Sequence, residues 1–108
     1  MELQERYRSW VDEVISRGEV WIIGEGDLNT VIEDPNDDRD LNLLFSSRAD
    51  AEQHRERGEV FPPIAVDDLP ALLDRVDGRG EGLALWHHDR WIVADAAPLA
   101  EELRDRAA

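Results

Sequence analysis

The chain contains no cysteine and no lysine, so all twelve of its basic residues are arginine. The lack of cysteine excludes disulfides, thiolate nucleophiles and cysteine zinc sites. Apolar runs long enough to span a bilayer are also absent, and the N-terminal residues are acidic and amphipathic, unlike a signal peptide. We therefore expect a soluble, cytoplasmic protein that makes no contact with a membrane.

Basic residues are scarce, because 12 of them face 26 acidic residues and give a formal charge of −14. Direct binding of DNA or RNA is disfavoured, since phosphate neutralisation requires clustered basic residues and these arginines are scattered among carboxylates. Two explanations of the acidity stay open. A salt-rich cytoplasm or a GC-rich genome favours Asp, Glu and Arg without any partner, whereas an interface for a basic partner is the functional alternative.

A chain of 108 residues has the length of one domain with one core. Hydrophobic residues make up 42% of it and include four tryptophans, which is typical of a packed interior and not of an acidic disordered chain. We expect residues 1–108 to form a single domain.

Two apolar runs flank a short polar turn in Gly82–Ala94, a pattern typical of a β-hairpin. A two-residue loop at its centre places Trp86 opposite Trp91, a favourable aromatic cross-strand pair. His87 then lies opposite Arg90. Because both faces of this ribbon are apolar, we expect it in the middle of a sheet or beneath helices.

The rest of the chain shows alternating helical and strand patterns. Gly18 and Gly58 are placed to end helices, and Ser47 and Asp67 to begin them. The expected elements are a helix at 2–17, a hairpin of strands 19–23 and 28–33, a strand at 41–45, a helix at 48–57, an edge strand or extended connector at 60–66, a short helix after 67, the hairpin above and a helix from about 98. These elements predict an α+β fold of order α-β-β-β-α-(β)-α-β-β-α, with a mostly antiparallel sheet of about five strands and about four flanking helices.

Residues 34–40 contain no apolar side chain and are expected to form a solvated loop whose neutralisation leaves the fold intact. Alternate positions carry oxygen ligands, as at the start of a calcium-binding loop. However, Arg39 stands where that loop needs glycine, and Phe45 stands where it needs a bidentate Glu. We therefore predict no metal site and no cofactor.

No catalytic group stands out in the sequence. His87 and His88 are adjacent, so a strand directs them to opposite faces and a tight turn splays them apart. The serines lie in helical or capping positions and not on a glycine-flanked nucleophile turn. His54 is expected on the surface of a polar helix. We predict a protein that is not an enzyme, and a small metal- or carboxylate-dependent hydrolase using His87 or His88 is the alternative.

Spaced aromatic residues and turns throughout the chain carry a family resemblance. They are Arg6-Tyr7, Trp10, Val20-Trp21, Leu44-Phe45 followed by Ser46-Ser47, the segment 66–73, and the late hairpin ending in Pro98-Leu99. In these residues the chain resembles a family of short bacterial proteins known as domain of unknown function 2750. The strand-Phe-Ser-helix step and the final hairpin resemble, more loosely, the N-terminal domain of the SseB family. The resemblance implies an α+β fold and no catalytic residue.

Acidic residues are concentrated between positions 25 and 40, where seven of them face a single base. They are Glu25, Asp27, Glu33, Asp34, Asp37, Asp38 and Asp40. If exposed, they form a negative field next to Trp21, and an aromatic anchor rimmed by charge is a common interface arrangement. Alternatively, Trp21 is a core residue. We predict a non-catalytic protein-binding module of the inhibitor, immunity or adaptor type that recognises a basic protein partner, with charge mimicry of nucleic acid as one form of this recognition.

Overall fold

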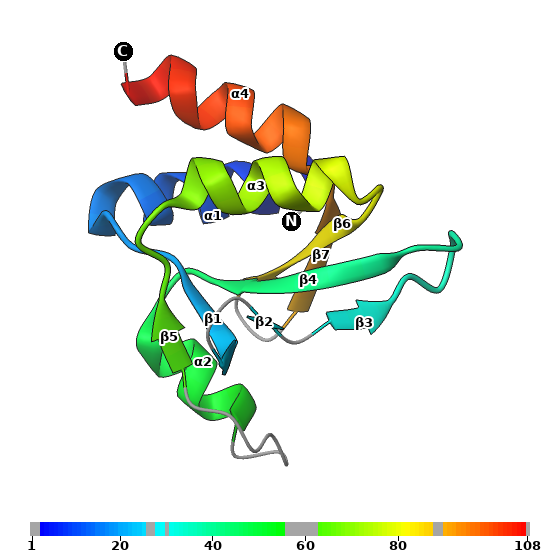
Figure 1. The fold of residues 1–108 in the computed structure, drawn as a ribbon. Helices are drawn as coiled ribbons and strands as arrows, with labels where there is room; N and C mark the ends of the chain where they lie inside the picture. Colours follow the sequence, from blue (N-terminus) through cyan, green and yellow to red (C-terminus); the bar gives the residue numbers. More distant parts are fainter. Residues whose placement is uncertain (1–2, 26–27, 30, 56–62, 88–89, 108) are drawn as a thin grey trace.

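The computed structural model describes residues 3–25, 28–29, 31–55, 63–87 and 90–107. Within them, a mixed and mostly antiparallel sheet is covered by helices on both faces (Figure 1). The elements are α1 (Leu3–Arg17), β1 (Trp21–Glu25), β2 (Leu28–Asn29), β3 (Val31–Glu33), β4 (Asp40–Phe45), α2 (Arg48–Arg55), β5 (Pro63–Ala65), α3 (Leu69–Gly78), β6 (Gly82–His87), β7 (Arg90–Ala94) and α4 (Ala96–Ala107). The predicted α+β fold is confirmed.

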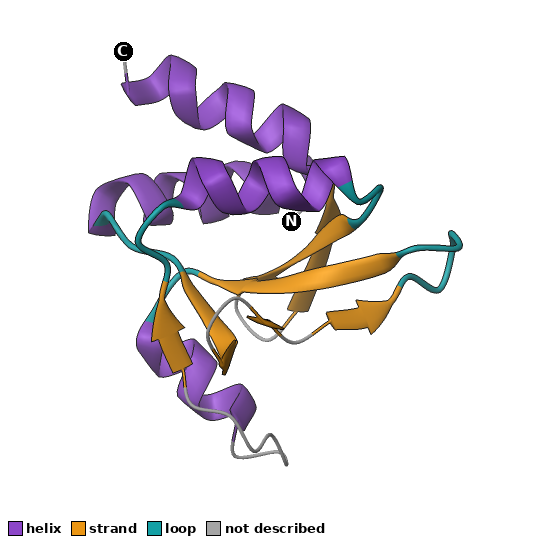
Figure 2. Cartoon of the chain, viewed as in Figure 1, coloured by secondary structure: helices purple, strands orange, loops and turns teal. Residues whose placement is uncertain are grey.

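The sheet has a helix layer on each side. Helices α1, α3 and α4 lie over one face, and α2 lies on the other face at the opposite end from the β3–β4 turn (Figure 2). None of these described helices is both long and apolar enough to cross a membrane.

Buried side chains divide into two clusters, one on each face of the sheet. The larger cluster includes Trp10, Val11 and Val14 of α1, Leu72, Leu73 and Val76 of α3, Leu99 of α4, and Leu44, Leu83, Leu85 and Ile92 of the sheet. The smaller cluster comprises Ile23, Leu41, Leu43, Phe45, Ala51, Ala84 and Trp86, with Trp21 and Trp91 packed against it. Strand residues alternate between the two clusters because successive side chains of a strand point to opposite faces.

The β6–β7 hairpin has the predicted register, with Trp86 opposite Trp91 and His87 opposite Arg90. Its loop, residues 88–89, lies outside the described residues. Strand β6 is buried along its whole length because it lies between β4 and β7. Strand β7 forms an edge of the sheet and packs against α1. The expected mid-sheet position therefore holds for β6, and the expected position beneath helices holds for β7.

Strands β4 and β6 pair in parallel from Leu41 opposite Gly82 to Phe45 opposite Trp86. The segment that connects them contains α2, β5 and α3, as a parallel pair requires a long crossover. This parallel pairing was not predicted. It brings the middle of the chain against its C-terminal hairpin.

The expected first hairpin is partly wrong. Strand β2 pairs with β1, but β3 pairs with β4, with Glu33 opposite Asp40. The cause is the turn at residues 34–39, where the backbone amide of Asp34 donates to the carbonyl of Arg39 at 3.0 Å. The loop predicted to separate two strands instead closes a hairpin between them.

Local signals at element ends are mostly confirmed. Gly18 ends α1 with φ of 69°, a conformation that favours glycine. Ser47 Oγ accepts a hydrogen bond of 3.2 Å from the backbone amide of Asp50 and caps α2. The cap of α3 is Asp68 and not Asp67, since Asp68 Oδ1 accepts the backbone amide of Ala71 at 3.1 Å.

The predicted edge strand in residues 60–66 is present in its second half. Strand β5 pairs with β1 from Ala65 opposite Trp21 to Pro63 opposite Ile23. Residues 60–62 lie outside the described part of the chain. An edge position suits a strand that begins with proline, which cannot donate to a ladder on both sides.

Candidate functional site

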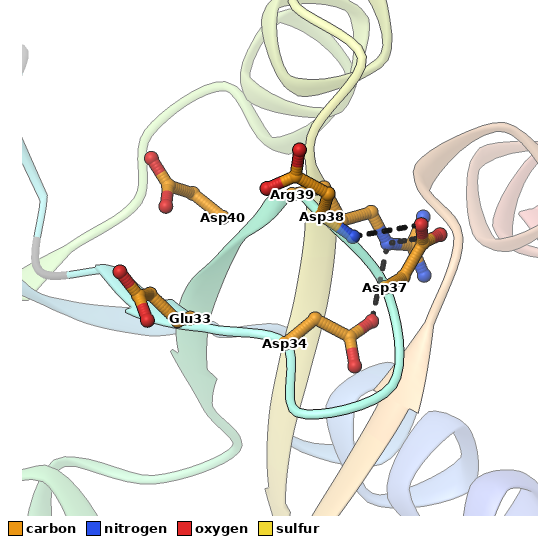
Figure 3. Close-up of a pocket in the computed structure, with 6 residues that line it drawn as sticks. All are labelled: Glu33, Asp34, Asp37, Asp38, Arg39 and Asp40. Atoms are coloured by element: carbon orange, nitrogen blue, oxygen red, sulfur yellow. Dashed lines mark hydrogen bonds and ion pairs between the residues drawn. The ribbon is translucent and has the colours of Figure 1, made fainter.

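The β3–β4 hairpin lies at one end of the sheet (Figure 1) and carries five of the seven acidic residues (Figure 3). Its turn encloses a hollow of about 380 Å³. The lining residues are Glu33, Asp34, Asp37, Asp38, Arg39 and Asp40. Five of the seven acidic residues of the candidate site therefore lie together.

Asp34 is turned inward and is only 9% exposed. Its Oδ1 accepts a 2.9 Å hydrogen bond from the backbone amide of Asn36, and its Oδ2 accepts a 3.3 Å hydrogen bond from Arg39 Nε. An Asp side chain that bonds the backbone two residues ahead forms a local turn. The expectation that the whole loop is solvated is wrong at this residue, which is structural.

Arg39 connects the turn to a distant part of the chain. Its Nη1 donates a 2.7 Å hydrogen bond to Asp95 Oδ1, and its Nε lies 3.7 Å from Asp37 Oδ2. The hydrogen bond to Asp95 raises the pKa of the guanidinium above its usual value, with Asp34 adding to this and partial desolvation opposing it. Arg39 therefore stays charged and holds three carboxylates in place.

Four acidic residues of the hairpin remain exposed, and they are Glu33, Asp37, Asp38 and Asp40. Glu33 and Asp40 are directly opposite in the antiparallel register and point away from the guanidinium of Arg39 (Figure 3). Like charges directly opposite on a sheet destabilise it. A cation placed between these two carboxylates would relieve the repulsion.

Exposed apolar side chains lie beside these charges. Val31 is 42% exposed and Ile32 is 37% exposed, so all three residues of β3 face solvent. Apolar residues rimmed by charge are a common composition for a protein interface. We call β3 together with the exposed carboxylates of Glu33, Asp37, Asp38 and Asp40 the acidic hairpin surface.

Trp21 lies apart from the carboxylates of this surface. It is opposite Phe45 on β4, five residues from Asp40, which corresponds to roughly 17 Å along the strand. The indole is half-buried against the smaller core cluster, and Arg48 Cζ lies 5.7 Å from its ring centroid. The side chain of Glu25 and the whole of Asp27 lie outside what the structure describes.

Among the described residues, no group of three or more His, Cys, Asp or Glu side chains is arranged to hold a metal ion. Asp34 stands at the first ligand position of the calcium-like pattern, and its carboxylate is bonded to Arg39. His88 lies outside the described residues.

His87 lies in a buried polar cluster that joins α1 to the ends of β4 and β6. It is 2% exposed, and its Nδ1 is 3.7 Å from Glu13 Oε2. Ser46 Oγ donates to the same Glu13 oxygen at 3.2 Å. In a hydrolytic triad the histidine lies between the serine and the carboxylate, whereas here the carboxylate is central. The fully buried Ser46 has no access to a substrate in this arrangement.

His54 is packed in an aromatic cluster, and its expected surface position is wrong. Its ring centroid lies 5.5 Å from Phe45, 5.5 Å from Trp91 and 6.1 Å from Trp86. The sequence contains a signal that could have indicated this. Ala51 and His54 are three residues apart, so they share the face of α2 that contacts the sheet.

Comparisons of the chain with known protein families, with curated proteins and with solved structures found no match. The resemblance to the domain of unknown function 2750 and SseB families stays a prediction.

Proposed function

We propose that the protein is a non-catalytic binding module of the inhibitor, immunity or adaptor type, and that the acidic hairpin surface recognises a basic protein partner. The observation that carries the proposal is the pair of exposed carboxylates of Glu33 and Asp40, held directly opposite each other. The arrangement is unfavourable in the free protein and favourable next to a cationic group.

The hairpin is held in place before a partner arrives. Arg39 bonds to Asp34 within the turn and to Asp95 outside it. A surface ordered in advance loses less entropy on binding, and clustered charge accelerates the encounter with an oppositely charged partner. Mimicry of nucleic-acid charge is one form that this recognition can take, since a protein that binds phosphates presents clustered basic residues.

Burial supports a binding module over the hydrolase alternative. His87 and Ser46 are buried, and through the partly exposed Glu13 they connect secondary-structure elements to one another. Groups in this position serve packing and polar satisfaction in the interior.

The experiment compares two variants that lose the same amount of negative charge. In the first, Glu33→Gln, Asp37→Asn, Asp38→Asn and Asp40→Asn neutralise the acidic hairpin surface and leave Asp34 in place. In the control, Asp74→Asn, Asp77→Asn, Glu101→Gln and Asp105→Asn neutralise four exposed carboxylates of α3 and α4. Basic partners are captured from a lysate on immobilised protein, and their association rates are then measured at two ionic strengths.

We expect the hairpin variant to associate about tenfold more slowly at low salt, with the difference shrinking as salt screens the charges. The control variant should change the rate by much less. Equal rates for the two variants would show that acidity acts as a diffuse coat, and would overturn the proposed function.

A further inference from the structure

The edges of a β-sheet differ in how they are protected from pairing with other chains. Proteins protect edge strands by short length, by proline or by charge. Strand β5 has three residues and begins with Pro63, and β3 has three residues and ends with Glu33. Strand β7 has five residues, and its single charge, Arg90, stands at its start. Within the described residues β7 pairs only with β6, so its outer edge is longer than those of β3 and β5, mostly apolar and unprotected.

The surroundings of β7 are also apolar. Val93 is 41% exposed, and Leu3 of the adjacent α1 is 57% exposed. A groove of about 300 Å³ lies between α1, β7 and α4, and it includes Tyr7 and Pro98 along with these two residues. The edge of the sheet is therefore continuous with an apolar surface of the kind that marks a protein contact.

We propose that the outer edge of β7 pairs with β7 of a second copy of this chain, in antiparallel orientation about a twofold axis at Ile92. In a symmetric pair of antiparallel strands, the twofold axis must pass through one residue position, so that residue lies opposite its own copy. An axis between two residues would pair neighbours in sequence, whose side chains point to opposite faces, whereas residues directly opposite each other share a face of the sheet. With Ile92 in that position, Trp91 lies opposite Val93 of the second copy, and this pairing occurs twice. Aromatic and β-branched side chains form favourable cross-strand pairs.

Charge at the two ends of β7 is the reason to choose a second copy over a different chain. Asp95, immediately after β7, belongs to a cluster in which Arg39 faces three carboxylates. Arg90 is exposed and has no ion-pair partner in the described part of the chain. The proposed register places Arg90 opposite Ala94 of the second copy, next to its Asp95. Arg90 of each copy then adds a positive charge beside the cluster of the other copy, in which three carboxylates face the single cation Arg39.

A twofold axis at Val93 instead of Ile92 pairs the side chains of the two copies less favourably. It places Trp91 opposite Asp95 of the second copy and moves Arg90 beyond that carboxylate to Ala96. The dimer about Ile92 joins two sheets through short strands, so its area is below that of a standard interface of about 1,600 Å². We expect a reversible dimer with a dissociation constant of about 10–100 µM.

The first test is sedimentation equilibrium of the wild type and two lysine variants over a range of concentrations, in about 0.15 M salt so that repulsion between the acidic copies is screened. Val93→Lys places a charge in the proposed interface. Val31→Lys is the matched control, because Val31 has nearly the same exposure on another edge strand, β3. Circular dichroism melting confirms that each variant is folded.

We expect the wild type and Val31→Lys to form dimers with equal affinity, and Val93→Lys to weaken dimerisation at least about tenfold. A wild-type protein that stays monomeric to about 1 mM, well above the expected dissociation constant, would overturn the proposal. So would a Val93→Lys variant that dimerises as the wild type does.

The second test locates the contact without a substitution. Hydrogen exchange is measured at concentrations below and above the dissociation constant. We expect the outward-facing amides of β7, which occur at alternate residues, to gain protection on concentration, and amides of β3 to keep their exchange rates. Protection gained at β3 and not at β7 would place the dimer contact elsewhere and overturn the proposal. Because β3 and β7 are different edges, this proposal and the proposed function can fail separately.

Discussion

Arg39 Nη1 lies 2.7 Å from Asp95 Oδ1, so an ion pair joins the β3–β4 turn to the start of α4 across 56 positions of sequence. Both ends of the contact are carried by exposed segments of the chain. The turn is thereby held against the C-terminal part of the fold, and its carboxylates have different roles. Asp34 supports the turn, whereas Asp38 faces solvent.

The two carboxylates of this turn should differ in their effect on stability. Asp34→Ala removes the acceptor of the Asn36 amide and of Arg39 in a nearly buried position, and should lower the free energy of unfolding by about 1–3 kcal/mol. Asp38→Ala is the control and should change it by less than about 0.5 kcal/mol. Urea denaturation measures both. Equal values would mean that the turn is a solvated loop after all.

Gly82 is required by the side chain of Arg39. A Cβ at this position would lie 2.7 Å from Arg39 Cζ and 2.9 Å from Leu41 Cδ2. Gly82→Ala should therefore displace the guanidinium from Asp95 and cost about 1–3 kcal/mol of stability.

Two further variants control the Gly82 measurement. Gly78→Ala meets no atom within 4 Å at the end of α3 and should be neutral or stabilising by up to about 1 kcal/mol. In an Arg39→Ala background, part of the cost of Gly82→Ala should disappear, which a double-mutant cycle of unfolding free energies detects. An unchanged cost would assign the clash to Leu41 alone.

The paired tryptophans of the β6–β7 hairpin should contribute unequally. Trp86 is 4% exposed between two strands, so Trp86→Ala should cost about 3–5 kcal/mol. Trp91 lies on the edge strand and is half-buried, so Trp91→Ala should cost about 1–3 kcal/mol. Thermal melting of both variants gives the order. A larger effect at Trp91 would contradict the edge position of β7.

Tyr7 is the only tyrosine in the chain, so absorbance of tyrosinate reports it alone. Burial and the charge of Glu102 raise the pKa of its phenol above 10.0, and Arg106 opposes this shift. Spectroscopic titration should give a pKa above that value. Glu102→Gln should lower it, whereas Glu101→Gln, which neutralises the exposed neighbouring carboxylate, should have little effect.

The raised pKa of Tyr7 also makes stability depend on pH. The folded state favours the neutral phenol, so the raised pKa stabilises the folded state, and this stabilisation is complete below the unfolded pKa near 10. It is lost as pH rises through the folded pKa. The variant Tyr7→Phe has no phenol to ionise, so it should lose less unfolding free energy than the wild type as pH rises. Urea denaturation at several alkaline pH values tests this.

Signals that depend on neighbours in sequence were sufficient for much of this fold. The alternation of Trp86 and Trp91 about a two-residue loop determined their register, because side-chain periodicity and turn length act locally. Gly18 and Ser47 marked helix ends for the same reason, since each satisfies backbone groups within four residues. The concentration of acidic residues before β4 was likewise evident from composition.

Contacts between distant segments were decided only by the tertiary structure. The parallel pairing of β4 with β6 depends on how the intervening helices pack, which no local pattern specifies. His54 is polar on a polar helix, yet packing of α2 against the sheet places it among aromatic rings. The burial of Asp34 depends on Arg39, and the position of Arg39 depends on Asp95. Sequence spacing determines which residues share a face or a turn, whereas the choice of partner across the core is made by the free energy of packing the whole chain.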